Sequence, residues 1–207
     1  SHQIRTPLTA VNLLLAELSS AGPEAREAAV FALRQQMGRI DWLVNALLKL
    51  AKLDAGTVRL QPEPLALETL IRRAAEPLAI LMDVKGQSLE IHASGSVVCD
   101  PQWTAEALGN ILDNAIKYTP PGGSVTVSVR PWQFYTRVDI ADTGIGIAEE
   151  HYNDIFQRFY RDPQVASQEG VGLGLYLANG IITRQKGYIS VKSKVGKGTT
   201  FSVYLLS

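Results

Sequence analysis

Two carboxamides and one ammonium group recur at helical spacing within residues 108–120. Asn110, Asn114 and Lys117 stand at positions i, i+4 and i+7, so an α-helix would place them on one face. The apolar residues of the segment cover the opposite side: Leu108, Ile111, Leu112 and Ala115. Two amide oxygens and a lysine can hold a hydrated magnesium ion and the phosphates that it bridges. Considered alone, however, the segment is better explained as an amphipathic surface helix.

Asp142 begins a second cluster, at the end of a predicted strand. A carboxylate there can accept a hydrogen bond from an exocyclic amine, such as the one that adenine offers. Gly144 and Gly146 follow, and glycine lets a ligand approach the backbone closely. An ordinary Asp-Thr-Gly turn is the better explanation of this cluster alone.

Residues 170–175 place glycines at the start of a predicted helix. The first amide N–H groups of a helix lack intrahelical partners, so they can bind phosphate together with the positive end of the helix dipole. The spacing differs from the dinucleotide-binding motif, which has two residues before its last glycine. Gly196-Lys197 does not form a phosphate-binding loop, because Gly198 stands where serine or threonine is required.

His2 is a candidate for covalent chemistry. It lies roughly 160 degrees around the helix axis from Ile4, the first residue of an apolar seam, and Thr6 follows one turn later on the same face. Pro7 removes the hydrogen bond to the carbonyl of Gln3 and should bend the helix beside the histidine. A lone exposed histidine is usually only a surface residue, but a neighbouring threonine and a kink favour a function. His92 and His151 have no evident partners.

Two apolar seams must position His2. The first comprises Ile4, Leu8, Val11, Leu15 and Leu18, and the second comprises Val30, Leu33, Met37, Ile40, Val44, Leu47 and Ala51. The break at 19–24, with Pro23 starting the next helix, predicts an antiparallel hairpin. One hairpin cannot bury both seams, and dimerisation into a four-helix bundle would. Because the second helix outruns the first, we expect the natural chain to continue upstream of Ser1.

The rest of the chain alternates between helices and strands after a proline-rich stretch, 61–64. Helices are expected at 67–84, from 101 through the segment of Asn110, at 148–161 and at 172–185. Strands are expected at 89–92, 97–100, 124–130, 135–141, 188–194 and 199–206. This mixture predicts an α+β sandwich in which helices cover one face of a mixed sheet.

Composition excludes several classes of function. The 20 basic and 20 acidic residues of this 207-residue chain cancel, which argues against a nucleic-acid partner or an anionic-membrane surface. The single cysteine, Cys99, cannot form an internal disulfide, which fits a reducing compartment. No Cys/His spacing indicates zinc, no Ser/His/Asp set is visible, and no apolar run approaches the roughly 20 residues of a membrane span.

Taken together, these clusters resemble the sensor histidine kinases of two-component signalling. Residues 1–9 resemble the phosphoacceptor box, 110–119 the N box, 142–147 the first glycine box, 156–161 the F box, 170–175 the second glycine box and 196–199 the last nucleotide-contacting turn. The match covers nearly the whole chain in family order. It implies a dimerisation and histidine-phosphotransfer domain at 1–58, a linker at 59–64 and a Bergerat-type ATP-binding α/β sandwich at 65–207.

The resemblance also implies a site for ATP with Mg²⁺. It assigns the metal to Asn110 and Asn114, and the phosphates and ribose side to Lys117 and Tyr118. The adenine end would comprise Asp142, Gly144, Gly146 and Thr199, and the phosphate end of a lid at 143–171 would comprise Gly172, Leu173 and Gly174. Arg158 or Arg161 would stabilise charge on the moving phosphoryl group.

Gln3 departs from the family, which usually has an acid beside the histidine. Glutamine can hold a ring N–H through its carbonyl but is no useful base, so autokinase activity would be weakened. Thr6 stands where the family orients water for dephosphorylation of the response regulator. A phosphatase-biased sensor or a non-catalytic ATP-binding dimeric scaffold is therefore an alternative. A gyrase-like ATPase is disfavoured because such enzymes carry glutamate, a base for water, at the position of Asn110.

The family implies three further expectations about the whole protein. The chain should form a homodimer through the hairpin and should pass phosphate to the receiver domain of a response regulator. It should be the cytoplasmic portion of a sensor that upstream segments anchor in a membrane.

Overall fold

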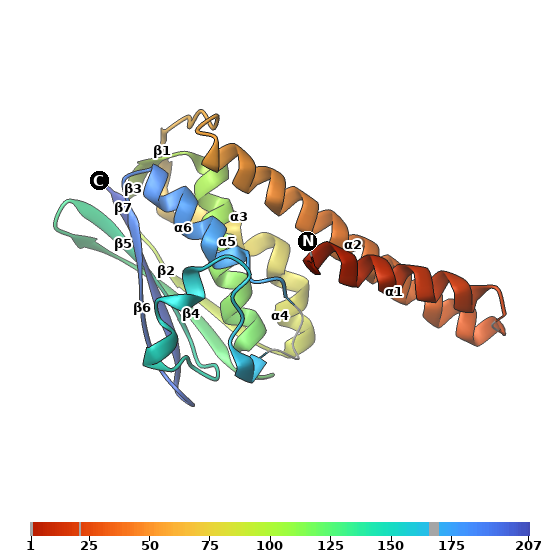
Figure 1. The fold of residues 1–207 in the computed structure, drawn as a ribbon. Coiled ribbons are helices and arrows are strands. Elements are labelled where there is room, and N and C mark those ends of the chain that lie inside the picture. The colour runs from red at the N-terminus through yellow and green to blue at the C-terminus, as the bar shows by residue number, and fades with distance from the viewer. Residues whose placement is uncertain (1, 21, 166–169) are drawn as a thin grey trace. The chain divides into compact units, whose positions relative to one another are not determined.

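The computed structural model describes residues 2–20, 22–165 and 170–207. The chain divides into two compact units, residues 1–55 and 56–207, and each is described by itself. Figure 1 shows the first unit as a pair of long helices and the second as a sheet with helices.

The first unit is the predicted helical hairpin. Helix α1 (His2–Leu18) contains Pro7, and helix α2 (Pro23–Asp54) begins with Pro23 after an extended Gly22. Proline suits the first turn of a helix because its missing N–H would have no intrahelical partner there. The prediction of two helices that meet at a break before Pro23 is confirmed.

Much of the apolar surface of this hairpin remains exposed. The exposed large apolar side chains are Leu8, Leu13, Leu15, Val30, Phe31, Met37, Trp42, Val44 and Leu48. Five of them, Leu8, Leu15, Val30, Met37 and Val44, belong to the two predicted seams. A single hairpin therefore does not bury its own seams, as the heptad spacing predicts.

The second unit is built on a five-stranded mixed sheet. Its strands are β2 (Ser88–His92), β4 (Ser124–Trp132), β5 (Tyr135–Asp142), β7 (Gly198–Leu206) and β6 (Tyr188–Lys194), in that spatial order. Strand β2 runs parallel to β4, and the other neighbours are antiparallel. A separate antiparallel pair joins β1 (Glu63–Ala66) to β3 (Ser96–Cys99).

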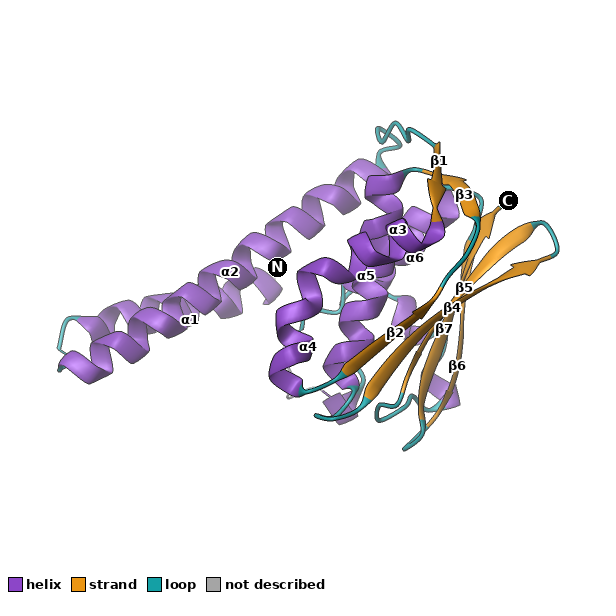
Figure 2. Ribbon diagram, turned by 180° about the vertical axis from the view of Figure 1, so that it is seen from behind, coloured by secondary structure: helices purple, strands orange, loops and turns teal. Residues whose placement is uncertain are grey.

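Helices cover one face of this sheet, as Figure 2 shows. They are α3 (Leu67–Ala75), α4 (Ala79–Lys85), α5 (Pro101–Tyr118) and α6 (Gly174–Arg184). The core lies between α5, α6 and the inward side chains of the strands, including the fully buried Val125, Val138 and Val203. The predicted α+β sandwich with a mixed sheet is therefore confirmed.

Two expected helices are wrong. Residues 67–84 form α3 and α4 with a 3₁₀ turn, η1 (Glu76–Leu78), between them. Pro77 lies in this turn, and proline removes a hydrogen bond from a helix interior and clashes with the preceding turn. Residues 148–161 form only the short 3₁₀ turns η2 (Glu149–His151) and η3 (Asp154–Phe156). A third 3₁₀ turn, η4 (Pro163–Val165), follows.

Strand β1 lies partly in the stretch for which the sequence predicts a linker. Glu63 pairs with Cys99 and Ala66 with Ser96. Proline tolerates such an edge strand, where its missing N–H costs no ladder hydrogen bond. Pairing with β3 therefore orders a segment whose local composition favours a loop.

The face of the sheet opposite the helices holds a buried carboxylate. Asp139 on β5 accepts hydrogen bonds from Arg137 Nε (2.7 Å), Ser202 Oγ (2.6 Å) and the guanidinium of Arg130. Burial by itself would raise the pKa of Asp139, but the bonds from Ser202, Arg137 and Arg130 together hold it below its usual value. This network joins β4, β5 and β7.

We expect Asp139→Ala to lower the free energy of unfolding by about 3 kcal/mol at neutral pH, because it leaves the largely buried Arg137 without its acidic partner. The folded-state pKa of Asp139 lies below the unfolded-state value. Its contribution is therefore present above the unfolded-state pKa and is lost as pH falls through the folded-state pKa. Urea unfolding from neutral pH down through the folded-state pKa of Asp139 measures both the loss of stability and its dependence on pH. The exposed Asp83→Ala is the control, and an equal loss in the two variants would contradict the prediction.

Candidate functional site

Helix α5 presents the predicted polar face. Asn110, Asn114 and Lys117 are half-buried, and the apolar residues of the opposite face are buried: Leu108, Ile111, Leu112 and Ala115. Asn110 Nδ2 donates to the backbone oxygen of Glu106 at 3.0 Å. This bond orients the amide so that its oxygen, Oδ1, faces the start of α6. A Cβ added to Gly174 would lie 3.3 Å from this oxygen.

The N-terminus of α5 is held by side chains that the sequence analysis did not select. Asp100 caps its N-terminus by accepting from the amides of Gln102 (3.1 Å) and Trp103 (3.0 Å). Gln185, just beyond α6, accepts from the Asp100 amide at 2.9 Å. An aspartate before a proline is a helix-start signal, so Asp100-Pro101 could have been found from the sequence.

Asp142 ends β5 with one carboxylate oxygen anchored. Its Oδ1 accepts from the amides of Gly144 (2.8 Å) and Thr199 (3.2 Å). Within the described part of the chain, no donor is recorded at Oδ2, which can therefore accept from a ligand amine. Burial raises the pKa of Asp142, and the two amides oppose that rise.

Gly144 and Gly146 sit against protein backbone. A Cβ at Gly144 would lie 2.6 Å from the Tyr118 oxygen, and one at Gly146, which has φ +74°, would lie 2.1 Å from the Lys194 oxygen. The Ile145 amide also donates to the Tyr118 oxygen at 3.2 Å. The glycines thus let the loop after Asp142 pack between the end of α5 and strand β6.

Thr199 reaches the same loop through Ser193. Their hydroxyl groups lie 2.8 Å apart, and Ser193 Oγ accepts from the Ile147 amide at 2.8 Å. Tyr152 OH donates to the Ser193 oxygen (2.6 Å) and accepts from its amide (2.7 Å). Ser193 and Tyr152 therefore connect the loop to β6. The sequence analysis missed both residues, because neither carries a local signal.

The second glycine cluster closes over the polar face of α5. Gly172 has φ +75°, and a Cβ there would lie 2.4 Å from the Tyr160 oxygen. A Cβ at Gly170 would lie 2.6 Å from Lys117 Nζ. Leu173 is fully buried, so only its backbone can face a ligand. Helix α6 begins at Gly174, which lies beside Asn110, while Lys117 lies beside Gly170. A helix start with an amide and a lysine nearby suits a phosphate.

The two candidate arginines occupy different surroundings. The Arg158 guanidinium carbon lies 4.8 Å from the ring centre of Tyr176 on α6. Arg161 Nη2 donates to the Val165 oxygen at 2.9 Å. Burial raises the pKa of Tyr118, and the positive charge of Arg161 opposes that rise. The positive charge of Arg161 thus acts on Tyr118, the last residue of α5.

The phosphoacceptor candidates lie in the other unit. His2 and Gln3 begin α1, but their side chains fall outside the described residues. Thr6 follows on α1 and is exposed, as predicted.

The described residues contain no cluster of three or more His, Cys, Asp or Glu side chains placed to hold a metal ion. Amide oxygens beside a phosphate-binding helix end nonetheless suit Mg²⁺, which keeps several waters and is usually bound with substrate phosphates. The residues therefore fit a nucleotide that carries its own metal. Among the described helices, none combines the length and apolar character needed to cross a membrane.

Comparison with known proteins matches both units to protein families. Residues 99–207 match the histidine kinase-, DNA gyrase B- and HSP90-like ATPase family, and residues 1–56 match the His Kinase A (phospho-acceptor) domain. The first match covers more than half of the chain and supports the use of ATP.

Individual relatives agree with these matches. The sensor protein kinase PmrB of Pseudomonas aeruginosa is 33% identical over 208 residues, which cover 99% of this chain and 44% of PmrB. The chain spans about half, or less, of the length of the curated relatives it matches. The Acinetobacter baumannii histidine kinase AdeS has the same fold, with a TM-score of 0.82 at 24% identity over 100% of this chain and 98% of AdeS. Full-length ShkA, solved in complex with AMPPNP, gives a TM-score of 0.75 at 26% identity over 100% of this chain and 45% of ShkA.

Proposed function

The chain belongs to the sensor histidine kinases of two-component signalling, and from this membership we propose that it phosphorylates His2 with ATP and passes the phosphoryl group to an aspartate of a response regulator. One observation carries the proposal. The second unit gathers Asp142, the amide-bearing face of α5 and the start of α6 around one region. Asp142 suits the adenine amine, and the amides of α5 and the start of α6 suit the phosphates with a metal ion.

Each end of ATP has a defined set of groups. Asp142 Oδ2 accepts from the adenine amine while Oδ1 stays bonded to the amides of Gly144 and Thr199. Lys117 and the first amides of α6 bind the phosphates. ShkA, which shares its fold with the whole of this chain, was solved in complex with AMPPNP, and this supports nucleotide binding by the chain. A magnesium ion held by the amide oxygens of Asn110 and Asn114 would supply positive charge at the phosphates.

The reaction is a nucleophilic displacement at phosphorus. A neutral imidazole nitrogen of His2 attacks the γ-phosphorus in line, so that an N–P bond forms as the O–P bond to ADP breaks. Transfer then breaks the N–P bond and forms an O–P bond to the aspartate of the regulator. The protein contributes positioning and charge neutralisation, and we assign the latter to Arg161, whose positive charge acts on Tyr118 at the end of α5.

Asn110 directs this chemistry away from water. An amide is neither protonated nor deprotonated near neutral pH, so it cannot act as the general base that hydrolysis requires. A Bergerat-fold ATPase is therefore the weaker candidate. Gln3 cannot serve as a base for His2, which favours slow autophosphorylation, while Thr6 is exposed on α1, where it can act in dephosphorylation of the regulator.

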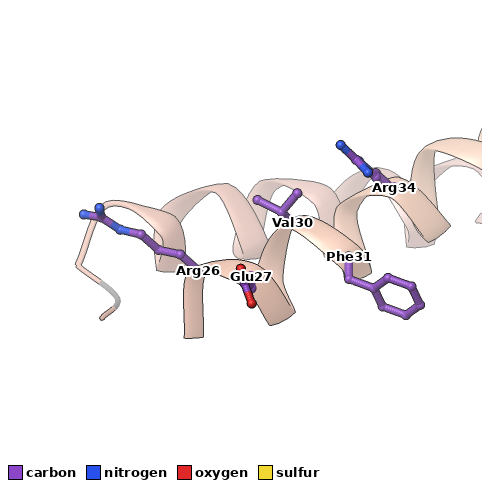
Figure 3. A pocket seen from close by; sticks show the side chains of 5 residues that line it. All are labelled: Arg26, Glu27, Val30, Phe31 and Arg34. Carbon is purple, nitrogen blue, oxygen red and sulfur yellow. The ribbon is translucent and has the colours of Figure 1, made fainter. Parts of the chain in front are cut away.

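The hairpin is proposed to form a homodimer and to receive the regulator. Its exposed seam residues need a partner surface, which a second hairpin would provide as a four-helix bundle. A hollow on α2 is lined by Val30 and Phe31 together with Arg26, Glu27 and Arg34 (Figure 3). Apolar side chains with charged neighbours are typical of protein interfaces. We also propose that the chain is the cytoplasmic part of a membrane-anchored sensor.

Incubation of the chain with γ-labelled ATP and Mg²⁺ tests the proposal. We expect an acid-labile, alkali-stable label on the protein, because a phosphoramidate has this stability and a phosphoester does not. The label should disappear in His2→Ala, which removes the nucleophile, and should persist in His92→Ala, which changes an exposed histidine of the other unit.

Two results would contradict the proposed kinase activity, and each would favour a different alternative function. Binding of ATP without any label would identify a non-catalytic scaffold. Steady release of inorganic phosphate without label on His2 would identify an ATPase.

A further inference from the structure

Lys85, the last residue of α4, places its ammonium group against the C-terminus of α5. We infer that Lys85 is a positioning residue for the nucleotide site, because its three hydrogen bonds hold the helical turn that carries Lys117 and Tyr118. The inference rests on the proposed function for its effect on nucleotide binding. Its effect on α5 itself is independent of that function.

The last four carbonyl groups of a helix have no intrahelical partners, so each needs another donor. In α5 all four are satisfied. The Ala115 oxygen accepts from the Thr119 amide (3.1 Å) and hydroxyl (2.7 Å). The Ile116 oxygen accepts from Lys85 Nζ at 2.6 Å, and the Lys117 oxygen accepts from it at 3.0 Å.

The third bond of Lys85 extends beyond the helix. Its Nζ donates to the Thr119 oxygen at 2.7 Å, so the three protons of the ammonium group have three carbonyl acceptors. The buried Gln87 Nε2 supports two of the same oxygens, those of Ile116 (3.0 Å) and Thr119 (2.7 Å). Lys85 and Gln87 therefore act on one turn from one side.

This turn is directly connected to the nucleotide site. The remaining carbonyl, that of Tyr118, accepts from the Ile145 amide in the loop after Asp142. Lys117 lies in the same turn, with its Nζ against Gly170. Unwinding the turn would thus move a phosphate-binding group and release the loop that anchors the adenine-binding carboxylate.

A cation is the appropriate group at this position. The C-terminus of a helix carries the negative end of the helix dipole, and hydrogen bonds from a charged donor are stronger than neutral ones. A neutral side chain of similar length would fill the space without satisfying the carbonyls. Lys85→Met is such a change, and Lys192→Met at an exposed position of β6 is the matched control.

The first readout is amide hydrogen exchange of the whole chain without nucleotide. In Lys85→Met we expect the amides of Thr119 and Ile145 to exchange at least about tenfold faster, since local opening becomes easier. Amides of β5 and β7 should keep their rates. Uniform acceleration of all amides would show only a loss of global stability, and unchanged rates at Thr119 and Ile145 would show that Lys85 does not hold the turn. Either result would overturn the inference.

The second readout is affinity for AMPPNP with Mg²⁺. We expect Lys85→Met and Lys85→Ala to bind AMPPNP about tenfold more weakly than the unaltered chain does. The affinity of Lys192→Met should equal that of the unaltered chain. Methylammonium should partly restore binding and slow exchange in Lys85→Ala, because it can donate to the same carbonyls. Tetramethylammonium at equal concentration has no N–H group and should not. Rescue by both cations would indicate an ionic-strength effect and would overturn the inference.

The outcomes separate the inference from the proposed function. If the unaltered chain binds no AMPPNP, the proposed function fails, and exchange at Thr119 and Ile145 alone decides whether Lys85 holds α5. If the unaltered chain binds AMPPNP and both Lys85 variants bind it equally well, the inference fails and the proposed function stands.

Discussion

Asp142→Asn should weaken binding of AMPPNP by at least about 100-fold while leaving the fold intact. The carboxylate has two acceptor oxygens, and both are needed. Oδ1 accepts from the amides of Gly144 and Thr199, and Oδ2 is the acceptor for the adenine amine. Asparagine has one oxygen and one NH₂ group. The NH₂ group of asparagine must therefore face either the two backbone amides or the adenine amine. In either orientation two hydrogen-bond donors face each other, and neither has an acceptor.

Calorimetric titration of the purified chain with AMPPNP measures this effect. A change at an exposed aspartate, Asp83→Asn, is the control, and we expect its affinity to equal that of the unaltered chain. Inosine triphosphate, which carries an oxygen in place of the adenine amine, should bind the unaltered chain poorly. Asp142→Asn should lose this preference. Retention of tight, adenine-selective binding in Asp142→Asn would exclude Asp142 from the base site.

Asn110→Ala should reduce labelling of His2 by at least about 100-fold at saturating ATP, because one fixed dipole at the developing charge is removed. The amide of Asn110 is oriented by its bond to the Glu106 oxygen, so its own oxygen is available for a metal ion before any ligand arrives. Alanine maintains the helix but has no side-chain oxygen that could bind the metal ion. Binding of ADP in the absence of Mg²⁺ should change little, since its adenine contacts involve Asp142.

Asn45→Ala is a close control for Asn110→Ala. Asn45 Nδ2 donates to the Asp41 oxygen at 3.0 Å, which is the same i to i−4 bond that Asn110 makes at 3.0 Å. Loss of that helix bond alone should leave labelling within about twofold of normal. Equal losses in the two variants, or a Mg²⁺ dependence unchanged in Asn110→Ala, would contradict a metal-binding role.

Periodicity was sufficient to predict the long helices. In α2 and α5 the apolar residues recur along one face over many turns, so local pattern and tertiary burial agree. Asn110, Asn114 and Lys117 could be assigned to one face for the same reason. Asp142 and the glycines could be selected because strand ends and turns have distinctive residue types.

The segment between Ala148 and Arg161 shows where such reasoning fails. Its local backbone hydrogen bonds close only isolated 3₁₀ turns, such as the bond from the His151 amide to the Ala148 oxygen at 3.0 Å. The Phe159 amide donates instead to the distant Gly172 oxygen at 2.8 Å. Phe159 itself has φ 63°, which a right-handed helix excludes. Contacts with β6 and the start of α6 outweigh the local preference for a helix there.

The residues that support the site were missed for a related reason. Ser193, Tyr152 and Lys85 act on segments far from them in the chain, as when Lys85 bonds to the oxygen of Ile116. Serine, tyrosine and lysine are common surface residues, and their types give no sign of a distant carbonyl or amide partner.

By itself the sequence determined the helical hairpin, the mixed sheet with its helices and the polar face of α5. These features follow from short-range spacing, because side-chain direction repeats every 3.6 residues in a helix and every two in a strand. The tertiary structure alone decided which oxygen of Asp142 is anchored, that Gly144 and Gly146 pack against backbone, and that Lys85 satisfies the last carbonyls of α5. Those facts depend on which distant groups complete each other's hydrogen bonds, and that pairing exists only once the chain has folded.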